Sequence, residues 1–201
     1  EFINGILCDY AINLVKKKEV DFFLGSKKYE PWMVESNPFY EIKSSFFTLT
    51  ENNISIEAKE RLTIGIIGND YEKILSEKFP NANIKIYEDY IYSIEALKNK
   101  DIDFIYEDQI PINFYTVKNN FFHLIKATNN LILKNPVHAI AYDKKNAKIF
   151  NEGFINIPLS ELLKLEKKWI INNNDYYYLN FKQQFNLTNE EIAFLKKHTI
   201  N

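Results

Sequence analysis

Three acidic turns hold the side chains of this sequence that could do chemistry. They lie at residues 68–70, 88–89 and 106–108, and each follows a short apolar run. Glu107 and Asp108 could in principle form an acid–base pair, but adjacent carboxylates on one chain usually diverge in direction. The sequence shows no phosphate-binding glycine loop, no zinc-ligand spacing and no Cys/His pair close in sequence. The expected chemistry is therefore recognition of a ligand, and the chain is not expected to be an enzyme.

The elements expected around these turns alternate between strands and helices. Apolar runs predict strands at 62–67, 83–88 and 102–107, and helical spacing predicts helices at 70–79, 90–99 and 109–118. Such alternation is typical of an α/β fold with parallel strands and right-handed crossovers. Because ligands of such sheets sit beyond the carboxyl ends of the strands, the three acidic turns should point to one place.

A second group of candidate binding residues lies in the loop 25–40, which holds two prolines and many polar groups. Loops placed by a rigid strand commonly carry binding groups. Lys27, or the lysine after it, could supply a positive charge, and the polar Ser26 lies beside it. Tyr29 and Trp32 could wall a ligand site, because aromatic rings give contact area at low entropic cost and can face a cation. Solvated lysines and aromatics used for packing are the alternatives.

One local unit occurs twice in the chain. Residues 12–26 read INLVKKKEVDFFLGS and residues 94–108 read IEALKNKDIDFIYED, with 5 identical aligned positions. Each copy predicts a helix with a lysine-rich last turn, a tight turn and a short buried parallel strand, at 20–24 in the first copy. Two related lobes would explain the repetition, and chance similarity of two common units is the alternative.

The remaining segments extend this pattern. Helices are expected at 6–18, 144–151, 159–169 and from the capping box at 188–191, and strands at 42–50 and 136–142. A linker or extended strip is expected at 171–185.

Composition excludes several functional classes. The formal net charge of −2 gives no electrostatic argument for nucleic acid, and no apolar run approaches the ~20 residues of a membrane span. The single cysteine, Cys8, rules out an internal disulfide. Arg61 is the only arginine, so a bidentate arginine clamp on a carboxylate or phosphate is nearly unavailable.

Four stretches, in order, resemble the family 3 extracellular solute-binding proteins of bacteria, the Venus-flytrap proteins. EVDFFLG to NPFY (19–40) is similar to the family's "VD…G…S.PYY", and LTIGIIGNDYEKIL (62–75) to its "VGV..GSTYE..L". ALKNKDIDFIYED (96–108) is similar to "AL..G.VDA.V.D". HAIAYDKKNAKI, followed by ELLKLEKKWI (138–170), is similar to "YGIAV.K.N..L" and the closing "I..KW".

The resemblance implies a two-lobed periplasmic-binding-protein-like fold of type 2, with parallel-rich sheets and flanking helices. Residues 1–50 and 136–170 would form lobe 1 and residues 60–135 lobe 2. Residues 171–201 would be a linker and short C-terminal helix leading to a following module. A ligand held between the lobes would contact Ser26, Lys27, Tyr29, Trp32, Asn69, Asp70, Tyr71, Glu107 and Asp108.

The sequence also departs from the family. The family's first strand and first helix have no counterpart before residue 6, so lobe 1 is expected to be incomplete. Asp70 stands where the family tends to have Ser or Thr, and its carboxylate would repel an anion, whereas Asp108 matches the family's amine-binding aspartate. A cationic or amine-bearing ligand is therefore expected over a carboxylate one. Helix capping is the alternative role of both aspartates.

The tail narrows the expected function. LTNEEIAFLKKHTI (187–200) resembles a segment that starts or joins such domains in sensor kinases and diguanylate cyclases. The first expectation is a periplasmic sensor domain for an amino acid or amine, without a cofactor or metal, tethered to the inner membrane in its parent protein. The alternatives are the soluble binding component of an ABC importer and a degenerate flytrap that serves as a dimerisation or spacer module. The sequence leaves a homodimer open.

Overall fold

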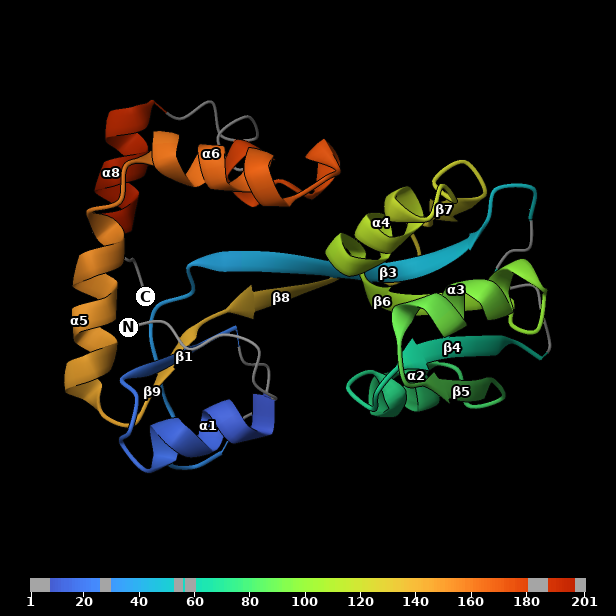
Figure 1. Ribbon diagram of the computed structural model, residues 1–201, viewed down its shortest axis with the longest axis horizontal. Helices are drawn as coiled ribbons and strands as arrows, with labels where there is room; N and C mark the ends of the chain where they lie inside the picture. The colour runs from blue at the N-terminus through green and yellow to red at the C-terminus, as the bar shows by residue number, and fades with distance from the viewer. Residues whose placement is uncertain (1–7, 26–29, 53–55, 57–60, 181–187, 198–201) are drawn as a thin grey trace. The chain divides into compact units, whose positions relative to one another are not determined.

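The computed structural model describes residues 8–25, 30–52, 56, 61–180 and 188–197. Within this described part the chain forms two compact units (Figure 1). Unit 1 contains the described residues of 1–41, 135–166 and 176–201, and unit 2 those of 42–134 and 167–175. Unit 2 is thus built mainly from one continuous stretch, whereas unit 1 is assembled from three.

A mixed sheet forms the centre of unit 2. Its strands follow the order β5-β4-β6-β3-β7, with β8 also paired to β3; β4 runs parallel to β5 and β6, and β3 runs antiparallel to β6 and β7. The elements are β3 (Tyr40–Leu49), β4 (Thr63–Ile67), α2 (Glu72–Lys78), β5 (Asn83–Tyr87), α3 (Tyr90–Lys98), β6 (Phe104–Asp108), α4 (Gln109–Lys118), β7 (Ile125–Ala127) and β8 (Leu133–Val137).

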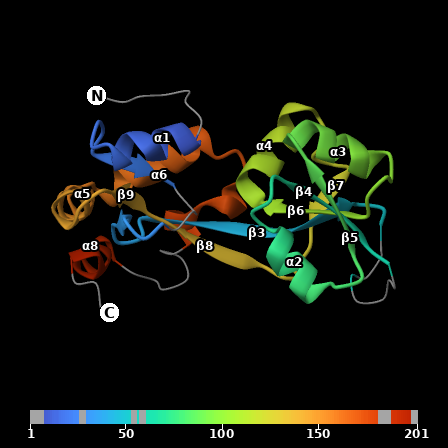
Figure 2. The same cartoon turned by 90° about the horizontal axis from the view of Figure 1, so that it is seen from below.

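Alternating side chains of this sheet build a core on each of its two faces. Phe46, Phe104 and Tyr106 pack with α2 on one face. Phe47 and Ile105, their neighbours in sequence, pack with α3 and α4 on the other. Successive strand residues point to opposite faces, so two buried layers follow directly from these runs of apolar residues. Figure 2 shows α2 on one side of the sheet and α3 and α4 on the other.

The alternation predicted for residues 62–118 is confirmed, since three strands and three helices occur there in the expected order. The carboxyl ends of the parallel strands β5, β4 and β6 therefore lie at one edge of the sheet. The α/β fold class is confirmed as well. The sheet of unit 2 contains both parallel and antiparallel pairs, and the sheet of unit 1 is antiparallel.

Unit 1 has a small antiparallel sheet of order β1-β9-β2. Its elements are α1 (Cys8–Lys16), β1 (Phe22–Leu24), β2 (Val34–Glu35), β9 (Ala139–Ala141), α5 (Lys144–Ile155) and α8 (Asn189–Lys197); α6 (Leu159–Trp169) begins in unit 1, and the 3-10 turn η1 (Asn173–Asp175) belongs to unit 2. The prediction of a buried parallel strand at 20–24 is wrong. β1 runs antiparallel to β9, and Leu24 is half exposed.

The predicted strand 136–142 is divided in two. β8 ends at Val137 and β9 begins at Ala139, with His138 between them. The Nδ1 atom of His138 lies 2.8 Å from the carbonyl oxygen of Ser36, so this histidine has a structural partner within unit 1.

Both faces of the unit 1 sheet carry helices. Phe22 of β1 lies 5.7 Å from Phe150 of α5, measured between ring centroids. Phe23, the next residue, packs against the cluster that contains Ile12 of α1. The two phenylalanines alternate as strand residues do, and so they place α5 and α1 on opposite faces.

The repeated unit detected in the sequence is a repeated turn. Lys18 and Lys100 both have φ 63°, and each donates its N–H to the carbonyl three residues earlier, at 2.9 and 3.1 Å. The next N–H bonds to the carbonyl five residues earlier, at 2.9 Å in both copies, which is the Schellman arrangement of a helix end. Asn120, with φ 60°, ends α4 in the same way. The turn is therefore common to three helices, and the strands that follow it pair differently.

The segment expected to be a linker is partly folded. Residues 173–175 form η1, and Tyr176 and Tyr178 are buried. The carboxylate of Glu166, 3% exposed, accepts hydrogen bonds from Tyr178 N at 2.9 Å, Leu179 N at 3.4 Å and the Tyr40 hydroxyl at 3.1 Å. The Tyr178 hydroxyl donates to the carbonyl oxygen of Phe39. We call these contacts the Glu166 clasp; it joins the last turns of α6 and residues 178–179 to the first residue of β3.

The predicted capping box at the last helix is confirmed. Glu191 N donates to Thr188 Oγ1 at 3.2 Å, and Thr188 N donates to Glu191 Oε2 at 2.8 Å. The backbone N–H and, at 2.9 Å, the hydroxyl of Thr188 both donate to Glu191 Oε2 and lower the pKa of Glu191.

The unit boundaries differ from those expected for the lobes. Residues 42–50, expected in lobe 1, belong to unit 2. Residues 176–180, expected in the linker, belong to unit 1. Residues 51–60, which lie between the expected bounds of the two lobes, are largely outside the described residues. No helix in the described ranges is both long and apolar enough to span a membrane.

Candidate functional site

The carboxylate of Asp108, at the end of β6, is held by two hydroxyl groups. Tyr71 donates to Asp108 Oδ1 at 2.6 Å, and Ser44 donates to the same oxygen at 2.6 Å. The two hydroxyl oxygens also lie 2.6 Å from each other. The three side chains come from the turn before α2, from β3 and from β6, all in unit 2. We call them the Asp108 cluster.

Tyr71 reaches Asp108 because the core of unit 2 fixes its ring. Its side chain is 5% exposed, and its ring packs edge-on against Tyr106, 5.0 Å away with an interplanar angle of 84°. Burial, followed by the negative charge of Asp108, raises the pKa of the Tyr71 hydroxyl far above its usual value. The phenol therefore keeps its proton and serves as a donor.

Ser44 reaches Asp108 through strand register. The antiparallel pairing of β3 with β6 sets Ser44 opposite Asp108 and Ser45 opposite Glu107. Ser44 and Ser45 are fully buried. Gln109 donates from Nε2 to Ser45 Oγ at 3.0 Å, while Glu107 Oε1 accepts the Asp108 N–H at 2.9 Å. Polar side chains thus line both faces of the sheet at this edge.

Asp108 stands at the N-cap position of α4 but does not cap the helix with its side chain. An N-cap aspartate normally accepts a hydrogen bond from the second or third N–H of the helix. The third residue here is Pro111, which has no N–H. The capping role that the sequence allowed for Asp108 is therefore not the one observed.

The capping role allowed for Asp70 is wrong. Helix α2 begins at Glu72 with Tyr71 as its N-cap residue, and no side chain caps it. Asp70 and Asn69 are both exposed in the turn between β4 and α2. In the third turn, Asp89 caps α3, since its Oδ1 accepts the Tyr92 N–H at 2.9 Å.

Of the candidates in the loop 25–40, Trp32 is the one that lies within the described residues. Ser26, Lys27 and Tyr29 lie outside the described residues. Trp32 belongs to unit 1, where its ring stacks on Tyr142 at 6.0 Å between centroids. Its Nε1 donates to Glu30 at 2.6 Å.

Two members of the Asp108 cluster are predicted by the sequence, and the third is not. Tyr71 and Asp108 were candidates, whereas Ser44 lies in a strand whose partner only the structure shows. For Asp108, the sequence did offer one signal that the side chain would not cap α4: Pro111 removes one of the two N–H groups that could donate to it. A half-buried carboxylate supported by two fixed donors can accept a cationic group from solvent.

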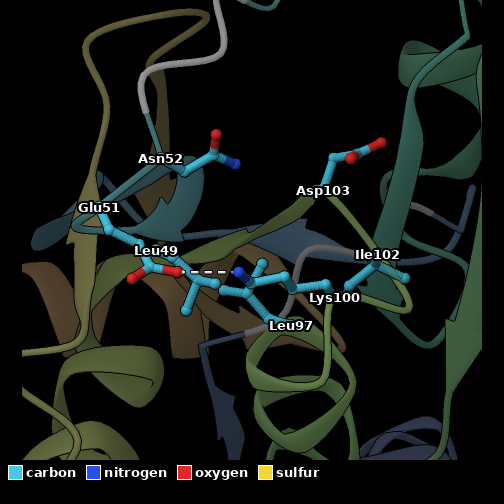
Figure 3. A pocket seen from close by; sticks show the side chains of 7 residues that line it. All are labelled: Leu49, Glu51, Asn52, Leu97, Lys100, Ile102 and Asp103. Atoms are coloured by element: carbon cyan, nitrogen blue, oxygen red, sulfur yellow. Dashed lines mark ion pairs between the residues drawn. The ribbon is translucent and has the colours of Figure 1, made fainter.

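A separate hollow of about 480 Å³ lies at the opposite edge of unit 2 (Figure 3). It is lined by Leu49, Glu51, Asn52, Leu97, Lys100, Ile102 and Asp103. Glu51 and Lys100 form an exposed ion pair of 3.0 Å across it. Asp103 precedes β6 and Asp108 ends it, so roughly 17 Å of strand separates the hollow from the Asp108 cluster, at about 3.3 Å per residue. The hollow is therefore not part of that cluster.

Metal chemistry has no visible basis in the described ranges of the chain. No group of three or more His, Cys, Asp or Glu side chains that could hold a metal ion occurs there.

Comparisons with solved structures identify the fold. The periplasmic VFT2 domain of Bordetella pertussis BvgS matches with a TM-score of 0.65 and 16% identity, over 84% of this chain and 75% of that chain. The GluR0 ligand-binding core, solved in complex with L-glutamate, matches with a TM-score of 0.65 and 12% identity, over 85% of this chain and 81% of that chain.

A transport-type protein is also similar. The periplasmic binding protein of an arginine transport system from Legionella pneumophila matches with a TM-score of 0.57 and 18% identity, over 83% of this chain and 80% of that chain. No protein-family model and no curated protein sequence matches the chain. The similarity in structure shows that the chain has the two-lobed, type 2 solute-binding fold, so the fold implied by the four sequence stretches is confirmed.

Proposed function

We propose that this chain is a small-molecule-binding domain on the extracytoplasmic side of a bacterial membrane, and that its ligand carries a protonated amine. The Asp108 cluster is the observation that carries the proposal. Two buried hydroxyl groups direct their protons at one carboxylate oxygen of Asp108, and the carboxylate is not used to cap α4. A carboxylate held in one direction by two hydrogen bonds suits a cationic partner.

The similar structures support binding rather than catalysis. They are described as a periplasmic VFT2 domain, a ligand-binding core and a periplasmic binding protein. Asp70, in the turn before α2, and Glu72, the first residue of α2, add negative charge to the same edge of unit 2. These charges disfavour an anionic ligand group there, and the domain should prefer amines or cationic amino acids to dicarboxylates.

A sensor role in a membrane signalling protein of the histidine kinase or diguanylate cyclase type is our first choice. The tail supports it, because residues 187–200 resemble a segment found at the junctions of such domains in sensor kinases and diguanylate cyclases, and residues 188–191 form the capping box of α8 there. The binding component of an importer is the second candidate, favoured by the similarity to the arginine-transport protein. A transmembrane helix and an output domain encoded after this segment would support the sensor role, and neighbouring transporter genes the importer role.

Thermal shift and calorimetric titration test the proposal. We expect L-arginine, L-lysine or putrescine to raise the melting temperature, because a ligand that binds only the folded state stabilises it. Asp108→Asn should abolish the shift and keep the fold, whereas Asp101→Asn, at an exposed turn, should leave it unchanged. Tight binding of succinate, a dicarboxylate without an amine, would contradict the proposal. A protein that no small molecule stabilises would instead favour a spacer or dimerisation module.

A further inference from the structure

Asp108 occupies the N-cap position of α4, where an aspartate side chain would normally accept a hydrogen bond from the first turn of the helix. It is the residue before α4, with φ −58° and ψ 136°. Only the Ile110 N–H could donate to a capping carboxylate, because the next residue, Pro111, has no N–H. Its carboxylate nevertheless bonds to two hydroxyl groups from other elements. Something other than helix capping must therefore fix the direction of this side chain.

The two donors are rigid. Ser44 is fully buried in β3, and Tyr71 is 5% exposed with its ring against Tyr106. Both donor–acceptor distances to Asp108 Oδ1 are 2.6 Å, within the range of charge-assisted O–H···O bonds. Donors that cannot move can select one rotamer of the carboxylate, because every other rotamer would lose both bonds.

We propose that Tyr71 and Ser44 are positioning residues, which hold the Asp108 carboxylate away from α4 and ready for a cationic ligand group. This inference rests on the proposed function, since it concerns the same site. It also specifies the ligand class. Two donors already stabilise the carboxylate, so a neutral hydroxyl adds little, whereas an ammonium group adds its full charge. The site should therefore distinguish amines from sugars and alcohols.

Isosteric variants of two neighbouring tyrosines test the role. Tyr71→Phe removes a hydroxyl that touches Asp108. Tyr106→Phe is the matched control, since it removes a buried hydroxyl of the same core that donates to the Leu131 carbonyl oxygen at 3.1 Å. We expect Tyr71→Phe to weaken binding of whichever of L-arginine, L-lysine and putrescine binds the unaltered protein by about tenfold, and Tyr106→Phe to change it less than twofold. Tighter binding in Tyr71→Phe would overturn the inference, because the hydroxyl would then compete with the ligand.

A second measurement needs no ligand. The Hα–Hβ couplings of Asp108, measured by NMR, report whether its side chain keeps one rotamer. We expect one rotamer in the unaltered protein and in Tyr106→Phe, and rotamer averaging in Tyr71→Phe and Ser44→Ala. A single unchanged rotamer in all variants would overturn the positioning role. Averaging in the variants, together with no binding of any amine by the unaltered protein, would support positioning and refute the proposed function.

Discussion

Three buried tyrosine hydroxyl groups link distant parts of this chain. Tyr71, Tyr106 and Tyr178 each direct a hydroxyl at an acceptor from a distant part of the chain: Asp108, the Leu131 carbonyl and the Phe39 carbonyl. Burial raises the pKa of all three, so they stay protonated and act as donors throughout the physiological range. A buried tyrosine here combines a large apolar surface with one directed hydrogen bond.

Two glycines should respond to alanine in opposite ways. A Cβ at Gly65 in β4 would lie 2.6 Å from Ile102 Cδ1 and 3.0 Å from the Tyr87 ring, so Gly65→Ala should destabilise by about 1–3 kcal/mol. Gly153 is exposed in α5 with nothing within 4 Å, and Gly153→Ala should stabilise by about 0.5–1 kcal/mol.

Urea denaturation of the two glycine variants checks this pair. The midpoints should move in opposite directions with an unchanged m-value. A neutral Gly65→Ala would show that Ile102 and Tyr87 can move aside, and that the sheet is less tightly packed at β4 than the distances indicate.

At the scale of elements, the sequence predicted unit 2 better than unit 1. The strands and helices of residues 62–118 follow from alternating apolar runs and local turn signals. In unit 1, by contrast, β1 and β2 have three and two residues, and both pair with β9, more than 100 residues away in the chain. No local pattern identifies such a partner, which is why the strand at 20–24 was wrongly predicted to be parallel.

The site was predictable to the same extent. Asp108 ends β6 and Tyr71 lies in the turn after β4, so the predicted strand ends alone identified both as candidates. Ser44 became visible only with the register of β3 against β6. The role of Asp70 was misjudged because α2 begins at Glu72 and so takes Tyr71 as its N-cap. Sequence propensity cannot place a helix end to within one or two residues, so it could not detect this shift.

The Glu166 clasp gives a prediction about one helix. Glu166 is buried and accepts two backbone N–H groups and one hydroxyl, whereas Glu161, on the same helix, is exposed and pairs with Lys164 at 2.7 Å. Glu166→Gln should destabilise by about 1.5–3 kcal/mol, because a carboxamide replaces one acceptor oxygen with a donor. Glu161→Gln should change stability by about 0.5 kcal/mol or less.

Hydrogen exchange locates the effect of these two variants. In Glu166→Gln, the amides of Tyr178 and Leu179 should exchange faster than in the unaltered protein, and in Glu161→Gln they should not. Equal exchange at both amides in both variants would mean that packing of the tyrosines, and not the carboxylate, holds this segment.

On the scale of the whole molecule, the two units differ in how the chain builds them. Residues 42–134 supply every strand pairing of the unit 2 sheet except the part of β3 and β8 that continues into unit 1. A fragment of residues 42–134 should therefore fold alone. It should be less stable than in the full chain, since it lacks the bond of 2.6 Å from Asn113 to Asp175.

Circular dichroism and amide NMR of fragments check this expectation. The fragment 42–134 should unfold cooperatively in urea, whereas residues 1–41, whose strands need β9, should remain unfolded when made alone. An unfolded 42–134 fragment would show that residues 167–175 are essential to unit 2.

The central place of β9 has a consequence for synthesis. β1 and β2 flank this strand in the sheet, yet a ribosome makes them about 100 residues before it, counting from Glu35 to Ala139. During translation the early strands must wait without their partner while the stretch between them and β9 folds first. Nascent chains that expose unpaired strands are prone to aggregate and attract chaperones. The position of β9, a strand of only three residues (Ala139–Ala141) in the middle of a small sheet, thus determines the order in which this molecule can assemble.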